Sequence, residues 1–225
     1  MLKTVSVASD APVAAPAKAH RVFIFDVSGS MSWALGDLRS AVKNKLPQLA
    51  NVGDLISIIW FSGRNQAGVL QEAVEIRSVL DFTGINKAID RYLQPVGMTG
   101  FVEPFDLATN LIGKVKAAHP DMQTVLFFHT DGMDNQWTER QIMNSVQAVA
   151  TVVDKAAVVE YGWYCNRPML TRIAEELGAT TIFASDFPAF EETFLSYVSR
   201  TSLGNGKRVF VFTPEASKPY AFAIV

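Results

Sequence analysis

The feature that most constrains the fold is the alternation of apolar runs with segments of helical periodicity. The apolar runs are typical of buried strands, and the segments between them repeat apolar residues three and four positions apart. Strands that alternate with helices pair in parallel, with helices covering both faces of the sheet. We therefore expect an α/β fold with a doubly wound, mostly parallel central sheet. The predicted strands span residues 22–25, 55–61, 68–76, 123–130, 156–161 and 180–184, and the predicted helices span residues 33–50, 81–93, 101–115, 138–151, 167–177 and 187–199.

A carboxylate and two hydroxyls lie together in the loop after the first predicted strand. Asp26, Ser28 and Ser30 alternate along this loop, and Gly29 allows the backbone to turn tightly between them. In open α/β sheets, ligands bind beyond the carboxyl ends of the strands, where this loop is expected. Ligands that are all oxygen atoms suit a hard divalent cation, above all Mg²⁺. A competing interpretation is that these side chains only cap the next helix, since Ser and Asp are common N-caps.

The Asp-x-Ser-x-Ser pattern after a buried strand resembles the metal-ion-dependent adhesion site of von Willebrand factor A domains. That family completes its site with a threonine from a second loop and an aspartate from a third. Thr99 and Asp131 occupy the corresponding places, the first in a Gly-Met-Thr-Gly loop and the second directly after an apolar strand. The resemblance covers roughly residues 20 to 200 and rests on three motifs in the family's order. It implies a metal site formed by Asp26, Ser28, Ser30, Thr99 and Asp131.

The resemblance also implies what such a site does. In this family the bound cation accepts an Asp or Glu of another protein, so the expected function is protein binding rather than catalysis. The expected ion is Mg²⁺, with Mn²⁺ or Ca²⁺ as substitutes. The family also implies an antiparallel edge strand at residues 68–76. Two positions depart from its usual pattern, because Met98 replaces a common glycine and His129 a common aliphatic residue.

Composition disfavours several classes of partner and setting. The net charge is -2 and no run of Lys or Arg exceeds two residues, which disfavours nucleic acid or an acidic membrane held by electrostatic attraction. No apolar run approaches the ~20 residues that span a bilayer. Cys165 is the single cysteine, so no disulfide can form within the chain. A reducing, cytoplasmic setting is therefore expected.

The chain is predicted to consist of one large domain with two flanking segments. Residues 1–19 are expected to form a short strand at residues 2–8 and an Ala/Pro-rich linker, and residues 20–203 the domain similar to von Willebrand factor A. Residues 204–225 are expected to form a C-terminal β segment, for which pairing with residues 2–8 is one arrangement. Pro47 is expected to kink the first helix or end it early.

Several polar residues near the predicted site have a structural interpretation that we favour. His129 is interpreted as a core histidine rather than a base beside Asp131. Asp134 and Asn135 are interpreted as solvated turn residues rather than as supports for the site. Cys165 is interpreted as a buried, inert thiol, because no base lies near it in the sequence.

Two further residues are left with two interpretations each. Trp33 follows the predicted metal loop directly, and it is either an aromatic anchor for a partner or a core residue. Glu103 lies close to Thr99, and it either rims the site or accompanies Pro104 at a helix start.

Two alternatives to metal-mediated protein binding are weighed. One is a structural or assembly subunit that uses its terminal strands, as the apolar residues 220–225 suggest. The other is a magnesium-dependent hydrolase of phosphate esters, which a metal site at strand ends would permit. The chain has no Gly-rich phosphate loop, and Ser28 and Ser30 have no convincing histidine base, so this alternative ranks lower.

Overall fold

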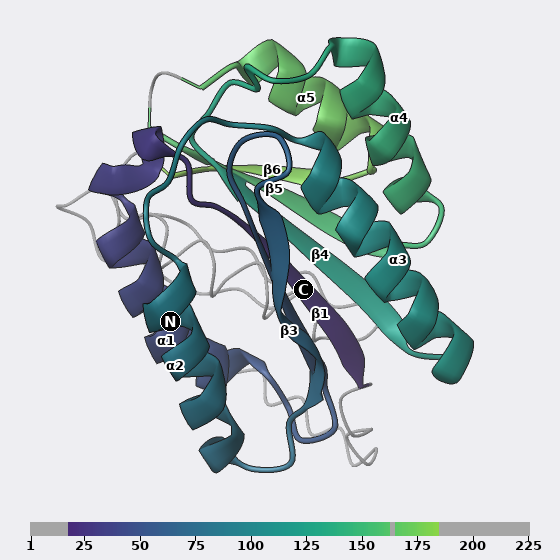
Figure 1. Cartoon of the computed structure of the whole chain (residues 1–225). Coiled ribbons are helices and arrows are strands. Elements are labelled where there is room, and N and C mark those ends of the chain that lie inside the picture. The colour runs from purple at the N-terminus through teal and green to yellow at the C-terminus, as the bar shows by residue number, and fades with distance from the viewer. Residues whose placement is uncertain (1–17, 163–164, 185–225) are drawn as a thin grey trace, which may run out of the picture.

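Six strands form one sheet in this computed structural model, which describes residues 18–162 and 165–184 (Figure 1). The strand order is β3-β2-β1-β4-β5-β6, and every neighbouring pair is parallel except β2 and β3. The predicted mostly parallel α/β fold is confirmed, including its antiparallel edge strand. The strands are β1 (Ala19–Asp26), β2 (Leu55–Phe61), β3 (Ala67–Glu75), β4 (Gln123–Thr130), β5 (Lys155–Tyr161) and β6 (Thr180–Ala184).

Helices cover both faces of the sheet. Figure 1 shows α1 and α2 on one side and α3, α4 and α5 on the other. Two short 3₁₀-helices, η1 and η2, precede α1 and α2. No helix in the described residues is long and apolar enough to cross a bilayer. The helices are η1 (Gly29–Trp33), α1 (Leu35–Leu49), η2 (Val79–Asp81), α2 (Phe82–Tyr92), α3 (Val102–Ala118), α4 (Glu139–Ala150) and α5 (Arg167–Glu176).

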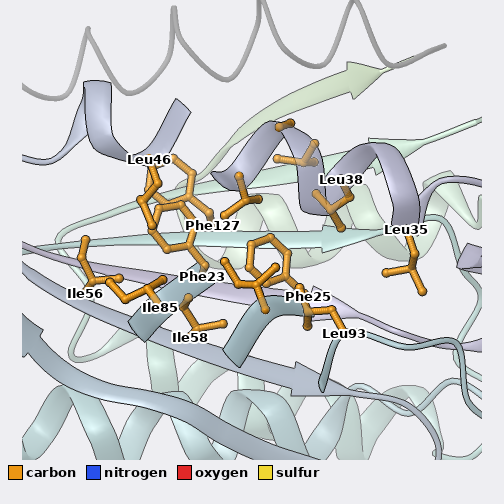
Figure 2. Close-up of a cluster of buried hydrophobic side chains, with 14 of the residues drawn as sticks. Phe23, Phe25, Leu35, Leu38, Leu46, Ile56, Ile58, Ile85, Leu93 and Phe127 are labelled. Carbon is orange, nitrogen blue, oxygen red and sulfur yellow. The ribbon is translucent and has the colours of Figure 1, made fainter. Parts of the chain in front are cut away.

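Strand β1 lies at the centre of the sheet and is buried on both faces. Its alternate side chains enter the two hydrophobic cores, with Phe23 and Phe25 on the face of α1 and Val22 and Ile24 on the face of α3. In Figure 2, Phe23 and Phe25 lie beside Phe127 of β4 and face the leucines of α1. The Phe23 and Phe127 rings stack with centroids 4.9 Å apart. Burial on both faces explains why this strand is continuously apolar in sequence.

The first helix differs from its prediction at both ends. The predicted segment, residues 33–50, begins in the structure as η1, and α1 itself starts at Leu35. The helix also continues past Pro47 to Leu49, so the expected early end is wrong. Pro47 lies in the last turn, where only one hydrogen bond is lost, and the Ala50 N–H still donates to the Leu46 carbonyl at 3.1 Å.

Some predicted elements lie outside the described residues. These are the strand at residues 2–8, most of the linker, the helix at residues 187–199 and the C-terminal β segment.

Candidate metal centre at the carboxyl ends of the strands

Three loops converge beyond the carboxyl ends of the central strands. The Ser28 and Ser30 hydroxyl oxygens lie 3.0 Å apart, and the Ser30 hydroxyl donates to Asp131 Oδ1 at 2.8 Å. Asp131 is distant from both serines in sequence, so this contact joins two of the three loops. We define the first, second and third loops as residues 27–34, 93–101 and 131–138, which follow β1, α2 and β4.

Gly132 shows that the remaining two predicted ligands lie at the same place. A Cβ atom added to Gly132 would lie 3.2 Å from Thr99 Cγ2 and 3.4 Å from Asp26 Oδ2. Such a Cβ atom would crowd Thr99 and touch Asp26, so both side chains lie against Gly132. The structure therefore brings together all five residues that the sequence singles out: Asp26, Ser28, Ser30, Thr99 and Asp131.

Asp26 is fully buried at the end of β1, and neighbouring groups hold both of its oxygens. Oδ1 accepts the Ser28 N–H at 2.8 Å, and Oδ2 accepts the Thr130 hydroxyl at 2.6 Å. Burial, and to a smaller extent the charge of Asp131, raise the pKa of Asp26 from 3.8 to about 6. Thr130 was missed in the sequence. Its signal is a polar residue that ends the apolar strand β4, which pairs directly with the strand of Asp26.

Asp131 is held on its second oxygen by a tryptophan. The Trp33 indole N–H donates to Asp131 Oδ2 at 3.3 Å, and desolvation raises the pKa of this carboxyl. Trp33 is 55% exposed, so its interpretation as a core residue is wrong. It lies at the rim of the site, where an anchor for a partner would stand.

The helix-cap interpretation of the first loop does not hold. Ser28 occupies the N-cap position of η1, yet its side chain accepts no capping hydrogen bond. The hydroxyls of Ser28 and Ser30 instead contact each other, and Ser30 contacts Asp131. The two serines therefore serve the site rather than the helix.

The second loop is fixed against the first by its backbone. The Gly29 N–H donates to the Gly97 carbonyl at 3.1 Å, and the Val96 N–H donates to the Val27 carbonyl at 2.7 Å. Gly97 has a φ of +62°, and a Cβ atom there would lie 2.8 Å from the Gln66 side-chain oxygen. Glycine is therefore needed at this position to place Thr99 beside the first loop.

The third loop clamps the second through Asp134 and Asn135, so these residues support the site loops, which corrects our interpretation, although Asn135 is exposed as a turn residue would be. Asn135 Oδ1 accepts the Thr99 N–H at 3.2 Å, and the Asn135 N–H donates to the Thr99 carbonyl at 3.0 Å. Asp134 Oδ2 accepts the Phe101 N–H at 2.5 Å. Both residues position Thr99, and the sequence alone could not show that these two loops meet.

Glu103 supports the loops rather than rimming the site. Its Oε2 accepts the indole N–H of Trp137 at 2.8 Å, and its Oε1 accepts the Asn65 N–H at 2.9 Å. Glu103 also lies in the first turn of α3, beside Pro104, so the helix-start interpretation is confirmed and the rim interpretation is wrong.

His129 and Cys165 lie apart from the proposed chemistry. His129 is fully buried, its Nδ1 lies 3.1 Å from the Tyr161 hydroxyl, and burial lowers its pKa to about 3. It is a neutral core histidine, as expected. Cys165 is only half-buried, and its Sγ lies 3.7 Å from Glu160 Oε2. Burial raises the pKa of this thiol, so it is protonated and a poor nucleophile.

The site carries negative charge that no cationic side chain among the described residues neutralises. Within residues 18–162 and 165–184, no Lys, Arg or His forms an ion pair with Asp26 or Asp131. The described residues also contain no group of three or more His, Cys, Asp and Glu side chains arranged for a metal. Two carboxylates with three neutral hydroxyls fit a hard cation that retains water, and they do not fit a site built on nitrogen or sulfur ligands.

Comparison with known proteins identifies the fold. No family model matches the chain, and no curated protein sequence matches it. Many solved structures are similar, among them a von Willebrand factor type A protein from Catenulispora acidiphila (TM-score 0.71, 20% identity, 86% of this chain and 44% of that one). Two others are proximal thread matrix protein 1 from the mussel byssus with a zinc-occupied MIDAS motif (0.64, 17%, 87% and 50%) and the pilus adhesin SpaC from Lactobacillus rhamnosus GG (0.66, 13%, 82% and 30%). The chain spans half or less of the length of each of these proteins. At these identities the similarity establishes the fold alone, and the chain has the fold of a von Willebrand factor A domain.

Proposed function

We propose that this chain is a protein-binding module that holds Mg²⁺ beyond the carboxyl ends of β1 and β4 and uses it to bind a carboxylate of a partner. One observation supports this proposal above the others. Five oxygen-bearing side chains, from the end of β1 and from three loops, lie close together, and in the described residues no Lys, Arg or His forms an ion pair with their carboxylates.

The hydrogen bonds suggest which residues would bind the ion directly and which would bind it through water. Ser28, Ser30 and Thr99 offer neutral hydroxyls, which leave the charge of the ion undiminished. Asp26 is held by Ser28 and Thr130, and Asp131 by Ser30 and Trp33, so both carboxylates are suited to act through water. A cation bound mainly by neutral oxygens and water seeks one more anionic oxygen, which a partner's Asp or Glu would supply.

The comparisons support the type of function without identifying a partner. One similar structure holds zinc at the corresponding kind of site, and another is an adhesin. These proteins share the fold at low identity, so the use of a divalent cation here is our inference. A cytoplasmic setting is likewise part of the proposal and rests on the single cysteine.

We favour binding over hydrolysis because the site has no activated nucleophile. The hydroxyls of Ser28 and Ser30 contact each other, and Ser30 donates to Asp131, which also accepts the indole N–H of Trp33. His129 lies in the strand that leads to the site, but its Nδ1 faces Tyr161 and its low pKa makes it a weak base. A structural role for residues 204–225 concerns a segment outside the described residues.

Titration with a divalent ion tests the proposal directly. We expect Mn²⁺ to bind the wild-type chain, and Ser30→Ala or Asp131→Ala to weaken binding about tenfold or more while the protein stays folded. Ser40→Ala is the matched control, because Ser40 is exposed on α1 and bonds only its own helix. Isothermal titration calorimetry measures the affinities, and circular dichroism reports folding. Equal affinities in the wild type and both site variants would contradict the proposal.

A further inference from the structure

The site lies in a pocket with an apolar wall. The pocket has a volume of about 430 Å³, and Ser30, Thr99 and Asp131 form part of its lining. Trp33 and Met133 line it as well, and they are 55% and 57% exposed. Large side chains with this exposure are costly to leave in water, and a cluster of them beside a polar site is typical of an interaction surface.

Each of the three loops supplies both an oxygen ligand and a large exposed apolar side chain. The first loop pairs Ser30 with Trp33, and the third pairs Asp131 with Met133. The second loop places Met98, which is 52% exposed, directly before Thr99. We name Trp33, Met98 and Met133 the apolar rim.

Two members of the apolar rim, Trp33 and Met98, lie in close-packed surroundings. Trp33 donates to Asp131, and its ring edge lies 3.3 Å from where a Cβ atom of Gly162 would stand. The Met98 Cβ lies 3.2 Å from the corresponding position of Gly63. Trp33 is therefore fixed beside the pocket, Met133 lines it, and Met98 directly precedes Thr99 of its lining. The flexible methionine side chains can adapt to what they contact.

The charges around the pocket limit what can enter it. Among the described residues that line it, Asp131 alone is charged at neutral pH. The wall thus offers no Lys or Arg to a second acidic residue of a partner. A bound cation would match one carboxylate, and the rest of the partner's contact must complement an uncharged, apolar surface.

We propose that the partner presents a single Asp or Glu directly next to a large apolar residue, best an aromatic one, which packs on the apolar rim. This inference rests on the proposed function, since the carboxylate reaches the site through the cation. Aromatic rings pack favourably against both tryptophan and methionine, so Phe next to Asp is the preferred pair. A run of several acidic residues fits the site less well, because only one of its carboxylates is neutralised.

Four fluorescein-labelled peptides of equal length test the inference against the full chain in Mg²⁺ and in EDTA. Their central pairs are Phe-Asp, Ser-Asp, Asp-Asp and Phe-Asn, each within the same neutral sequence. By fluorescence polarisation we expect Phe-Asp to bind about tenfold tighter than Ser-Asp, and Asp-Asp to gain nothing over Ser-Asp. Phe-Asn should not bind, and EDTA should abolish binding of Phe-Asp.

Variants of the rim separate it from the metal. Met133→Gln and Met98→Gln should reduce the advantage of Phe-Asp over Ser-Asp to threefold or less, while Mn²⁺ affinity by calorimetry stays at the wild-type value. Leu80→Gln is the matched control, because Leu80 is 76% exposed in η2, away from the three loops. It should leave both measurements unchanged.

The outcomes distinguish a failure of this inference from a failure of the proposed metal-mediated binding. Equal, Mg²⁺-dependent binding of Phe-Asp and Ser-Asp overturns the apolar rim and leaves the metal site standing. Tightest binding by Asp-Asp, or binding of Phe-Asn in EDTA, overturns the inference in favour of an electrostatic or a purely apolar partner. Mn²⁺ binding with no peptide binding also overturns it. Loss of Mn²⁺ binding itself removes the proposed function instead.

Discussion

The two ends of strand β1 both bury charged groups, yet they balance them differently. At its amino end, the buried Arg21 places Nε 3.0 Å from Asp54 Oδ2. Asp54 also accepts the N–H groups of Ala19, at 2.8 Å, and Asn51, at 2.9 Å. At its carboxyl end, Asp26 is equally buried, but its neighbours are neutral donors and a second aspartate.

We infer from this difference that the amino end of β1 is structural and that the carboxyl end is the one suited to bind a cation. The amino end contains one cationic and one anionic side chain within bonding distance, so its charges are matched within the chain. The carboxyl end contains two anions and, in the described residues, no counter-charge. A site that stays electrostatically incomplete after folding has a use for a cation from solution.

The largest expected effect comes from removing the Asp54 carboxylate from its buried ion pair with Arg21. Asp54→Ala leaves Arg21 buried without its carboxylate partner, which should lower the free energy of unfolding by about 3–5 kcal/mol. Mn²⁺ affinity of the folded protein should stay unchanged, because Asp54 lies at the opposite end of the sheet. Urea unfolding in EDTA measures the first quantity and calorimetry the second.

A matched control is the exposed pair of Lys43 and Asp90, whose charged atoms lie 2.6 Å apart. Asp90→Ala should cost less than about 1 kcal/mol, because solvent screens this pair. If Asp54→Ala is as mild as Asp90→Ala, the buried pair is not the structural element that we describe.

The next effect comes from pH at the unbalanced end. The folded pKa of Asp26, about 6, lies above its ordinary value of 3.8, so between these values the folded state binds more protons than the unfolded state. Stability of the metal-free protein should therefore fall as pH rises through this window. The loss is complete above pH 6 and amounts to about 3 kcal/mol for a shift of this size.

Asp26→Asn checks the sign of this dependence. The variant should be more stable than the wild type at pH 7 in EDTA, and the difference should shrink toward pH 4. Mg²⁺ should reverse the order at pH 7, because the ion stabilises only the protein that binds it. A wild type that gains stability from pH 4 to pH 7 in EDTA relative to Asp26→Asn would show that Asp26 is not strained by burial.

Much of this architecture could be predicted because it rests on local signals. Strands β2 and β4 have the predicted bounds, residues 55–61 and 123–130, since their apolar runs end sharply at polar loops. The helix predicted at residues 138–151 also starts where expected, because Thr138 is the N-cap of α4 and its hydroxyl accepts the Gln141 N–H in a capping box. Asp26 ends β1 and Asp131 follows β4, and parallel pairing of these two strands brings their carboxyl ends together.

The contacts that complete the site are not local, and the sequence alone does not determine them. Asp134 and Asn135 resemble ordinary turn residues, and only the meeting of two loops makes them supports of Thr99. Trp33 was ambiguous because a tryptophan after a buried strand suits either a core or a surface. Thr130 was overlooked because its hydroxyl contacts Asp26 across neighbouring strands.

Replacing Asp134 in the third loop should have an intermediate effect, and it should lower both stability and Mn²⁺ affinity. Asp134 accepts three backbone N–H groups, from Phe101, Gln136 and Trp137. Asp134→Ala leaves these donors without the carboxylate, so stability should fall by about 1–3 kcal/mol. Mn²⁺ affinity should also fall several-fold, because the second loop that carries Thr99 loosens.

The exposed Asp121, in the turn before β4, provides the control for Asp134. Asp121→Ala should alter neither unfolding in urea nor the calorimetric titration. Wild-type Mn²⁺ affinity in a destabilised Asp134→Ala protein would show that the third loop supports the fold without positioning the site.

The smallest expected effect concerns how much negative charge Asp131 offers to a bound ion. Trp33 restrains Asp131 Oδ2 through one long, half-exposed hydrogen bond, of the kind worth about 0.5–1 kcal/mol. Trp33→Phe keeps a ring at the rim and removes the donor, so Asp131 offers more of its charge to the ion. Mn²⁺ should then bind about threefold tighter by calorimetry, and a simple carboxylate such as acetate should compete less well for the bound ion, because that ion is better neutralised. Trp60→Phe, a change within β2, should leave both quantities unchanged. Weaker Mn²⁺ binding in Trp33→Phe would instead mean that the indole orients Asp131 toward the ion, and that the carboxyl end of β1 is closer to balance than its hydrogen bonds suggest.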